Sequence, residues 1–308
     1  MKTLCVTGGN GLLGVKLLAE AAGKYRLVSI DLHEAPLAPF ERMDYIQGDI
    51  TDPDLMRDVL KKTRADVVIH AAAFTDVDRC ESERELCSRI NVLGTSNTAS
   101  ACRSEGVKLV SLSTDYVFDG TAGPYSEDDS PHPVSHYGRT KWEAENAVLS
   151  ILEDFVIART AVLYGYWPGI RSNFVTWLVQ KLRNRETVSI VDDQYGSPTL
   201  ADELARTLIL LFERGKRGVY HTVGGEILNR YEFALRTAVS FGLDASLIGR
   251  TSTNRLNQTA PRPMQGGLIA DKVARELDIT LSTVDENLSY VRHQMEQGTD
   301  FFLAHAAG

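Results

Sequence analysis

A tyrosine and a lysine four residues apart form the first pair in this chain whose types and spacing could do chemistry. Tyr137 and Lys141 enclose the segment Gly-Arg-Thr, and residues i and i+4 share one face of a helix. A cation held beside a phenol lowers its pKa from the ordinary value of about 10, which would make Tyr137 a proton donor near neutral pH. Because the same spacing is common on solvated helix faces, the pair indicates a site only if other residues support it.

A glycine-rich turn near the amino terminus supplies the first support. Three glycines spaced by three follow an expected strand at residues 3–7 and open an expected helix at 11–22. Glycines permit a tight turn and close backbone approach, and free N–H groups at a helix start can hold a pyrophosphate. The spacing differs from the usual G-x-G-x-x-G, and a purely structural turn is the alternative. The residues expected to contact a dinucleotide here are Gly8, Asn10, Gly11, Leu12 and Gly14.

An aspartate at the end of the second expected strand suggests which dinucleotide binds. The Asp31 carboxylate can accept hydrogen bonds from the adenine-ribose hydroxyls and would repel a 2'-phosphate. NAD(H) is therefore favoured and NADP(H) remains possible, because Lys16 or Arg42 could fold towards a phosphate; a solvated strand-end aspartate is the alternative. Further cofactor contacts are expected after the third and fourth strands, at Asp49, Ile50, Ala71, Ala72 and Ala73.

A hydroxyl residue ends the fifth expected strand. Thr114 follows the run Val-Ser-Leu-Ser, and ligands bind at the carboxyl ends of strands in open α/β sheets. Its hydroxyl could bond a substrate carbonyl that a tyrosine protonates, although hydroxyls also cap strand ends. The glycine turn, this hydroxyl and the Tyr137–Lys141 pair occur in one order, which makes independent coincidence a poor explanation.

The elements that must position these residues alternate between strand and helix patterns. We expect an α/β fold with a Rossmann-type, doubly wound parallel sheet in residues 1–161 and a smaller, mixed substrate-binding lobe in 162–308, with some exchange of chain between the two. Strands are expected at 3–7, 26–31, 44–48, 66–70, 108–113 and 155–160. Helices are expected at 11–22, 53–62, 83–105, 135–151, 173–183, 201–214 and 229–241.

Composition excludes several classes of function. The chain has 308 residues and no apolar run long enough to cross a bilayer, and no secretory signal is visible, so a soluble cytoplasmic protein is expected. A net charge of -8 argues against non-specific nucleic-acid binding. Histidines and cysteines lack metal-ligand spacing, so we predict no metal. Structural or free thiols are expected at Cys5, Cys80, Cys87 and Cys102.

Longer motifs resemble the extended short-chain dehydrogenase/reductase family, and within it the dTDP-4-dehydrorhamnose reductases, over nearly the whole chain. The glycine turn and the Tyr-Gly-Arg-Thr-Lys segment are shared with many members. More specific matches are the runs 70–78 (His-Ala-Ala-Ala-Phe-Thr-Asp-Val-Asp), 113–120 (Ser-Thr-Asp-Tyr-Val-Phe-Asp-Gly), 192–199 (Asp-Asp-Gln-Tyr-Gly-Ser-Pro-Thr) and 260–263 (Ala-Pro-Arg-Pro), together with Asn91 and Arg159-Thr160.

The resemblance implies a catalytic trio of Thr114, Tyr137 and Lys141. Tyr137 would be the general acid, Lys141 would orient the cofactor ribose and lower the tyrosine pKa, and Thr114 would polarise the ketone of a nucleotide-activated 4-keto-6-deoxy sugar. Hydride would pass from the nicotinamide to C4 of the sugar. Asn91 would anchor a water or the helix geometry, with a helix N-cap as the alternative. The substrate contacts expected are Asp115, Tyr116, Val162 and Arg262, the last set in a rigid turn where it could hold the diphosphate.

Departures from the family pattern leave alternatives open. Rhamnose-forming members tend to carry tryptophan where this chain has Val162, which leaves open whether Trp167 replaces it. Trp142 and Trp177 are expected in the core. An epimerase or dehydratase is the second hypothesis, disfavoured because a dehydratase would carry two acids after Thr114. The third is a non-catalytic regulatory subunit like that of methionine adenosyltransferase, against which the intact trio argues. Family members also suggest a possible homodimer.

Overall fold

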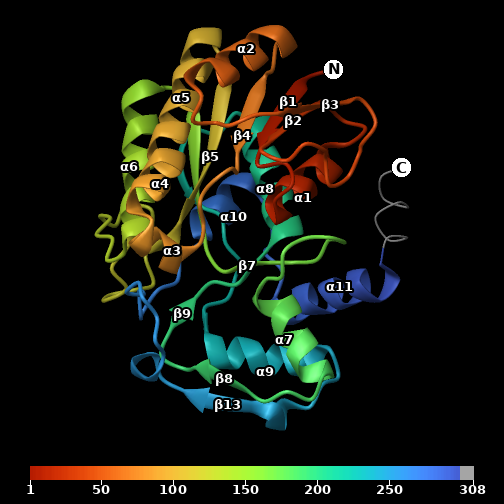
Figure 1. Cartoon of the computed structure of the whole chain (residues 1–308), viewed down its shortest axis with the longest axis vertical. Helices are drawn as coiled ribbons and strands as arrows, with labels where there is room; N and C mark the ends of the chain where they lie inside the picture. The colour runs from red at the N-terminus through yellow and green to blue at the C-terminus, as the bar shows by residue number, and fades with distance from the viewer. Residues whose placement is uncertain (299–308) are drawn as a thin grey trace.

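A seven-stranded parallel sheet forms the centre of the upper part of the molecule (Figure 1). The computed structural model describes residues 1–298. The strand order across the sheet is β11-β6-β5-β4-β1-β2-β3. The strands are β1 (Thr3–Thr7), β2 (Arg26–Asp31), β3 (Met43–Gln47), β4 (Val67–His70), β5 (Lys108–Thr114), β6 (Phe155–Thr160) and β11 (Gly218–His221). The six strands expected from the sequence are present within one residue at each end, and β11 was not expected.

The strands at the middle of the sheet are buried on both faces, as their nearly unbroken aliphatic sequences require. Every residue of β1 and of β5 is buried. Strand order reverses at β1, which pairs with β2 on one side and with β4 on the other. Ligands of doubly wound sheets bind outside the carboxyl ends of the strands at such a reversal. The ends of β1 and β4, at Thr7 and His70, therefore mark the expected crevice.

Helices cover both faces of this sheet and separate two apolar clusters (Figure 1). One face carries α1 (Leu12–Ala21), α8 (Ala201–Glu213) and α10 (Asp271–Leu277). The other carries α2 (Pro53–Thr63), α5 (Gly94–Glu105) and α6 (His136–Ile151). Since α8, β11 and α10 come from the second half of the chain, three segments beyond residue 161 pack within the sheet unit. The division at residue 161 stays a prediction.

The helix expected at residues 83–105 is wrong in detail. The structure has α3 (Val77–Ser82), α4 (Arg84–Ser88), a π-helical turn at Arg89–Leu93, and then α5. Asp76 caps α3 by accepting a hydrogen bond from the backbone of Arg79, so a helix start was missed six residues upstream. The π-turn turns the Asn91 side chain inward, where it is buried. π-turns have no clear sequence signature and often occur at functional sites.

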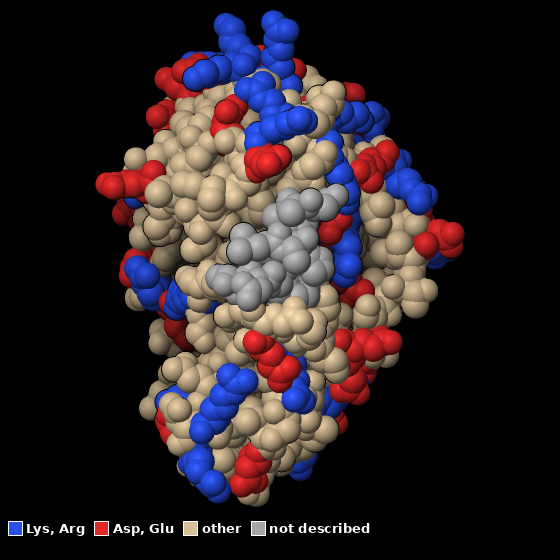
Figure 2. Space-filling model, turned by 90° about the vertical axis from the view of Figure 1, so that its right-hand side faces the viewer, with Lys and Arg blue, Asp and Glu red and all other residues tan. Residues whose placement is uncertain are grey.

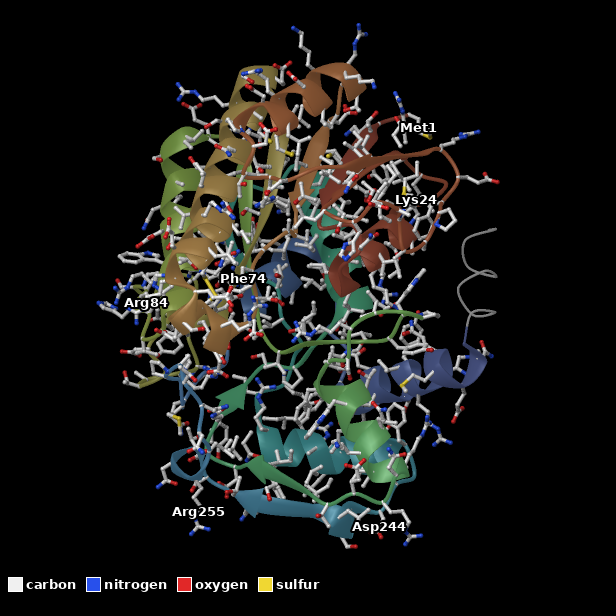
Figure 3. The ribbon with its side chains drawn as sticks, viewed as in Figure 1. Met1, Lys24, Phe74, Arg84, Asp244 and Arg255 are labelled. Carbon is white, nitrogen blue, oxygen red and sulfur yellow. A yellow bond between two sulfur atoms is a disulfide. The ribbon has the colours of Figure 1, made fainter. Side chains whose placement is uncertain are left out.

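The expectation of four thiols is also wrong, because Cys80 and Cys87 form a disulfide with Cα atoms 5.4 Å apart. Its sulfur atoms lie beside Phe74 (Figure 3). Residues seven apart in a straight helix would be separated by about 10 Å, too far for a disulfide. The break between α3 and α4 brings the two cysteines together. Cys5 and Cys102 are free and buried, as expected.

A smaller lobe lies below the sheet unit (Figure 1). Its helices are α7 (Phe174–Arg183), α9 (Arg230–Ser240) and α11 (Val284–Gln297), which enclose two further apolar clusters. Its strands pair in twos: β7 (Leu163–Tyr164) with β10 (Thr199–Leu200), β8 (Val188–Val191) with β13 (Ile248–Thr251), and β9 (Tyr195–Gly196) with β12 (Leu228–Asn229). The lobe is thus mixed α and β.

The molecular surface mixes charges of both signs. Figure 2 shows lysine and arginine side chains interspersed with acidic ones over the face that it displays. Within residues 1–298 no helix has the length and apolarity that crossing a bilayer requires. Trp177 is half-buried and packs against the lobe core. Trp142 is 36% exposed on the outer face of α6, so its expected core position is wrong.

Candidate functional site

The turn between β1 and α1 requires glycine at two positions for steric reasons. Gly8 has φ +73°, and a Cβ there would lie 2.8 Å from the backbone nitrogen of Ala72. A Cβ on Gly14 would lie 2.0 Å from the carbonyl oxygen of Gly8. The turn is also fixed to β2, because the N–H groups of Gly8 and Gly9 both donate to the Ile30 carbonyl. The backbone of the turn is therefore held tightly against the ends of β2 and β4.

The start of α1 is suited to an anion. Gly11 occupies the N-cap without a side-chain cap, and the first turn contains no acidic residue. The first N–H groups of a helix lack intrahelical partners and carry the positive end of the helix dipole. A dinucleotide pyrophosphate fits these donors and the glycine surface beside them.

Asn10 and Asp31 lie at the edge of this turn, but their side chains also organise the loop after β2. The Asn10 Nδ2 donates to the Ala35 carbonyl at 2.9 Å, and its Oδ1 accepts from the Leu37 N–H at 2.8 Å. The Asp31 carboxylate accepts from the Asn10 N–H at 3.0 Å and lies 2.6 Å from Nδ1 of His33. A carboxylate that neighbours the glycine turn in this way can face a ribose.

The two cations considered as partners for a 2'-phosphate lie elsewhere. Lys16 is buried, and its Nζ contacts Asp202 of α8 at 2.8 Å and Gln294 of α11 at 3.2 Å. Burial lowers the pKa of Lys16, and Asp202 opposes this shift. Arg42 precedes β3 at the amino end of the sheet, where its carbonyl accepts from Leu27. Asp31 ends β2 at the opposite edge.

The remaining predicted cofactor residues divide into two groups. Ala71, Ala72 and Ala73 leave β4 next to Gly8, with the Ala71 N–H donating to the Thr7 carbonyl at 3.2 Å. They belong to the crevice. Asp49 closes a local turn by accepting from the Thr51 N–H at 2.9 Å. Ile50 is buried against the start of α5, so its side chain packs into the fold.

Tyr137 stands in the first turn of α6, which is capped by Ser135 accepting from the Gly138 N–H at 3.1 Å. A Cβ on Gly138 would lie 2.1 Å from the carbonyl oxygen of Tyr116. Gly138 thus lets α6 approach the segment after β5, a role that sequence reasoning missed. The Tyr137 ring is buried and meets the Tyr116 ring edge-on at 5.7 Å.

The direction of the Tyr137 pKa differs from the expectation. Burial raises the pKa of Tyr137, which a hydrogen bond with Thr114 partly offsets and Asp115 reinforces. The Lys141 Nζ donates instead to the Leu112 carbonyl at 2.7 Å, and burial lowers the pKa of Lys141 to about 8, against the opposing charge of Glu145. The net direction of the Tyr137 pKa is thus opposite to the expected lowering, and the role of Lys141 stays a prediction. Both side chains are protonated at neutral pH.

Thr114 joins Tyr137 to an acidic neighbour. Its Oγ1 donates to Asp115 at 3.0 Å and accepts from the Tyr116 N–H at 3.3 Å. Burial raises the pKa of Asp115 to about 6, and the Thr114 hydrogen bond and the positive charge of Arg230 oppose the rise. Arg230 is the first residue of α9 in the lobe, and no sequence motif singled it out. It brings a lobe cation near Asp115, the acidic neighbour of Thr114.

The predicted substrate residues Arg262 and Val162 have different structural surroundings. The Arg262 guanidinium is bound to Asp78 of α3 at 2.8 Å and to the Ala260 carbonyl at 2.9 Å. Val162 has φ +44°, a region that β-branched residues rarely adopt. Trp167 is buried against Val15, so its side chain packs into the fold.

Asn91 fixes the segment that faces the trio. Its Nδ2 donates to the Phe74 carbonyl at 3.1 Å and to the Thr140 hydroxyl at 3.0 Å, and its Oδ1 accepts from the Phe74 N–H at 2.8 Å. Asn91 thereby joins α6 to the loop after β4. Of the alternatives considered, it serves helix geometry, and it is not an N-cap. No cluster of three or more His, Cys, Asp or Glu that could hold a metal occurs among residues 1–298.

A parallel sheet with a glycine turn at its reversal point, and a threonine, tyrosine and lysine at its carboxyl edge, defines an oxidoreductase of the short-chain dehydrogenase/reductase type. The family model described as "RmlD substrate binding domain" matches residues 1–296. The chain belongs to this family.

Individual relatives agree with this assignment. A dTDP-4-keto-6-deoxy-D-glucose reductase of Streptomyces niveus is 36% identical over 84% of this chain and 85% of its own. A probable low-salt glycan biosynthesis reductase of Haloferax volcanii is 32% identical over 92% of this chain and 95% of its own. The structure of a dTDP-4-dehydrorhamnose reductase of Bacillus anthracis, in complex with NADP, matches with a TM-score of 0.86 and 30% identity, covering 96% of this chain and all of that one.

Proposed function

We propose that the protein reduces the 4-keto group of a nucleotide-activated 4-keto-6-deoxy sugar with a nicotinamide cofactor. The observation that carries the proposal is the meeting of Thr114, buried Tyr137 and Lys141 at the same sheet edge as the glycine turn. The names of the relatives in Streptomyces niveus and Bacillus anthracis support the substrate class.

The residues of the chain have separate tasks in this reaction. When bound, the reduced nicotinamide supplies the hydride that reaches C4 of the sugar. Tyr137 gives its phenolic proton to the C4 oxygen, so that ketone plus hydride plus proton yields the alcohol. Its raised pKa keeps the phenol protonated before the step. Thr114 hydrogen-bonds the same oxygen, and the Lys141 ammonium offers donors for the ribose and stabilises negative charge on Tyr137 after transfer.

NAD(H) is the favoured cofactor in this proposal. Asp31 presents a carboxylate near the glycine turn, and Lys16 is already bound to Asp202 and Gln294. The Bacillus anthracis relative is in complex with NADP, so NADP(H) use is the competing prediction. A cytoplasmic location and a homodimer also remain predictions.

The test is oxidation of NADH or NADPH by a panel of dTDP-4-keto-6-deoxy sugars, followed by the loss of reduced-nicotinamide absorbance. Wild-type protein is expected to turn over one of them, and Tyr137→Phe to bind the cofactor but lose turnover by at least about a hundredfold. Cofactor binding without net oxidation, together with sugar isomerisation or loss of water, would favour the epimerase or dehydratase. No turnover together with co-purification of methionine adenosyltransferase would favour the regulatory subunit.

A further inference from the structure

A buried carboxylate lies beneath the catalytic face of α6 and has no role in the reaction described so far. Glu145 follows Lys141 by one helical turn, and its side chain is 4% exposed. Its Oε1 accepts from the Ser113 hydroxyl at 2.5 Å and from Nε of Arg159 at 3.0 Å, while its Oε2 accepts from Nη2 of Arg159 at 2.7 Å. A buried ion costs desolvation energy unless such partners compensate for it.

The partners of Glu145 come from the two strands that end at the site. Ser113 immediately precedes Thr114 in β5, and Arg159 of β6 is paired with Ser113 in the strand register. Glu145 therefore fixes α6 to the ends of β5 and β6 at once. Because Thr114 lies on β5 and Tyr137 on α6, this set of hydrogen bonds sets the distance between the two hydroxyls.

Glu145 also acts on Lys141 through its charge. Lys141 is buried, burial lowers its pKa, and Glu145 opposes the lowering. The other titratable groups around them are neutral or balanced: the pKa values of His70 on β4 and His221 on β11 are both lowered to about 3. Burial raises the pKa of Tyr137. Arg159 carries the compensating positive charge on the far side of Glu145.

We propose that Glu145 is a positioning residue for the reduction, which aligns Thr114 with Tyr137 through Ser113 and whose charge keeps Lys141 protonated. The inference rests on the proposed function, because it assigns Lys141 a role that requires its proton. A carboxylate that served only to join α6 to the sheet would stabilise the fold without changing how the site titrates.

Two matched substitutions separate the aligning role of Glu145 from the effect of its charge on Lys141. Ser113→Ala removes one hydrogen bond and leaves all charges, so kcat should fall about fivefold, as expected for one hydrogen bond, with no change in pH profile. Glu145→Gln removes the charge, so the alkaline limb of kcat/KM should move to lower pH by about one unit. Glu143→Gln, on the exposed side of the same helix, is the control and should change neither.

NADH affinity gives a second readout that does not depend on turnover. The NADH Kd is measured by nicotinamide fluorescence between pH 6 and 9. In Glu145→Gln it should begin to rise at a lower pH than in wild type, by the same shift as the alkaline limb of kcat/KM. If wild-type protein binds NADH but reduces no sugar, the proposed reaction fails. The pH at which NADH affinity is lost in Glu145→Gln and in wild type then decides the role of Glu145. If Glu145→Gln fails to fold, Glu145→Asp keeps the charge and shortens the side chain, so kcat should fall while the alkaline limb stays at the wild-type pH. A folded Glu145→Gln whose limbs in both measurements coincide with wild type, or a Glu145→Asp whose kcat equals that of wild type, would overturn the proposal.

Discussion

The Thr114 hydroxyl donates its hydrogen bond to the Asp115 carboxylate at 3.0 Å, although its proposed task is to donate to a substrate ketone. The acceptor is a carboxylate whose pKa burial raises to about 6. Above that pH Asp115 is ionised and holds the Thr114 proton. Below it, a protonated Asp115 can donate to Thr114 and release that hydroxyl to the substrate.

Asp115→Asn should therefore stabilise the protein at high pH. The folded pKa of about 6 exceeds the ordinary aspartate value of 3.8, so the folded state binds the proton more tightly and loses stability as pH rises from about 4 to 6. Removing the charge should recover up to about 3 kcal/mol at pH 8 and nothing below pH 4. Urea unfolding at pH 8 and pH 4 measures both values.

Asp119→Asn is the control with the opposite sign. Hydrogen bonds from Tyr125 and Thr121 lower the pKa of Asp119, so its ionised form favours the folded state and its stability is lost as pH falls. This variant should lose stability at pH 8 and little at low pH. Two variants with the same pH trend would contradict the assignment of Asp115.

At position 162, glycine should be a more stable replacement than alanine, which reverses the usual order of stability. At φ +44°, glycine relieves backbone strain that alanine retains, so Val162→Gly should be more stable than Val162→Ala by about 0.5–1 kcal/mol. Val156, buried in β6, is the control, where glycine should be the less stable replacement. Denaturant midpoints of the four variants give the comparison, and equal ordering at both positions would exclude strain at Val162.

Two glycines of the cofactor turn should respond differently to alanine. A Cβ on Gly14 meets the Gly8 carbonyl oxygen at 2.0 Å, whereas one on Gly11 approaches the same atom at 3.2 Å. Gly14→Ala should cost about 1–3 kcal/mol of folding stability and abolish NADH binding. Gly11→Ala should fold normally and weaken NADH binding alone. Thermal unfolding and NADH titration test this, and equal Tm losses would argue against the steric account.

Substitutions in the Arg262–Asp78 ion pair should show whether Arg262 binds the substrate diphosphate or only ties the proline-flanked turn to α3. If Arg262 binds a diphosphate, Arg262→Lys should raise the sugar KM by about tenfold or more, because lysine lacks the planar fork, with an unchanged NADH Kd. If it only ties the turn to α3, Asp78→Asn should raise KM equally. Steady-state kinetics of both variants distinguish these roles. A direct contact between Arg262 and the diphosphate requires a larger rise in sugar KM for Arg262→Lys than for Asp78→Asn.

The disulfide predicts a thiol count. Unfolding without reductant should expose two reactive thiols, from Cys5 and Cys102, and reduction should expose four. Reduction should also lower stability by about 2–3 kcal/mol, since the bond closes a short loop. Titration of the unfolded chain with a chromogenic thiol reagent measures the thiol count. The double variant Cys80→Ala/Cys87→Ala is the control for the stability change, because its stability should not respond to reductant. Four thiols without reductant would exclude the bond.

The sequence predicted the sheet well because buried parallel strands are short aliphatic runs whose pattern is local. It also located Thr114, Tyr137 and Lys141, whose motif reflects a common architecture. It missed β11 because Gly218–His221 is short and mixed in character, and only its pairing with β6 makes it a strand.

The sequence was least informative about the pKa values of the site residues. The pKa of Tyr137 is decided by burial and by where the Lys141 ammonium points, and both depend on the packing of α6 against β5. Arg230 acts on Asp115 from α9, a segment whose distance from the site is fixed only by the tertiary fold. Residue spacing alone cannot supply these directions.

The position of β11 has a consequence for how the chain is made. The sheet gains its last strand only after residue 221 has been synthesised, and α8, which covers α1, is completed just before it. On the ribosome, the first 160 residues would therefore expose the apolar surface of β6 and of α1 while the lobe segments emerge. We expect a fragment ending at residue 161 to aggregate, and a circularly permuted chain to tolerate new ends only outside residues 161–221.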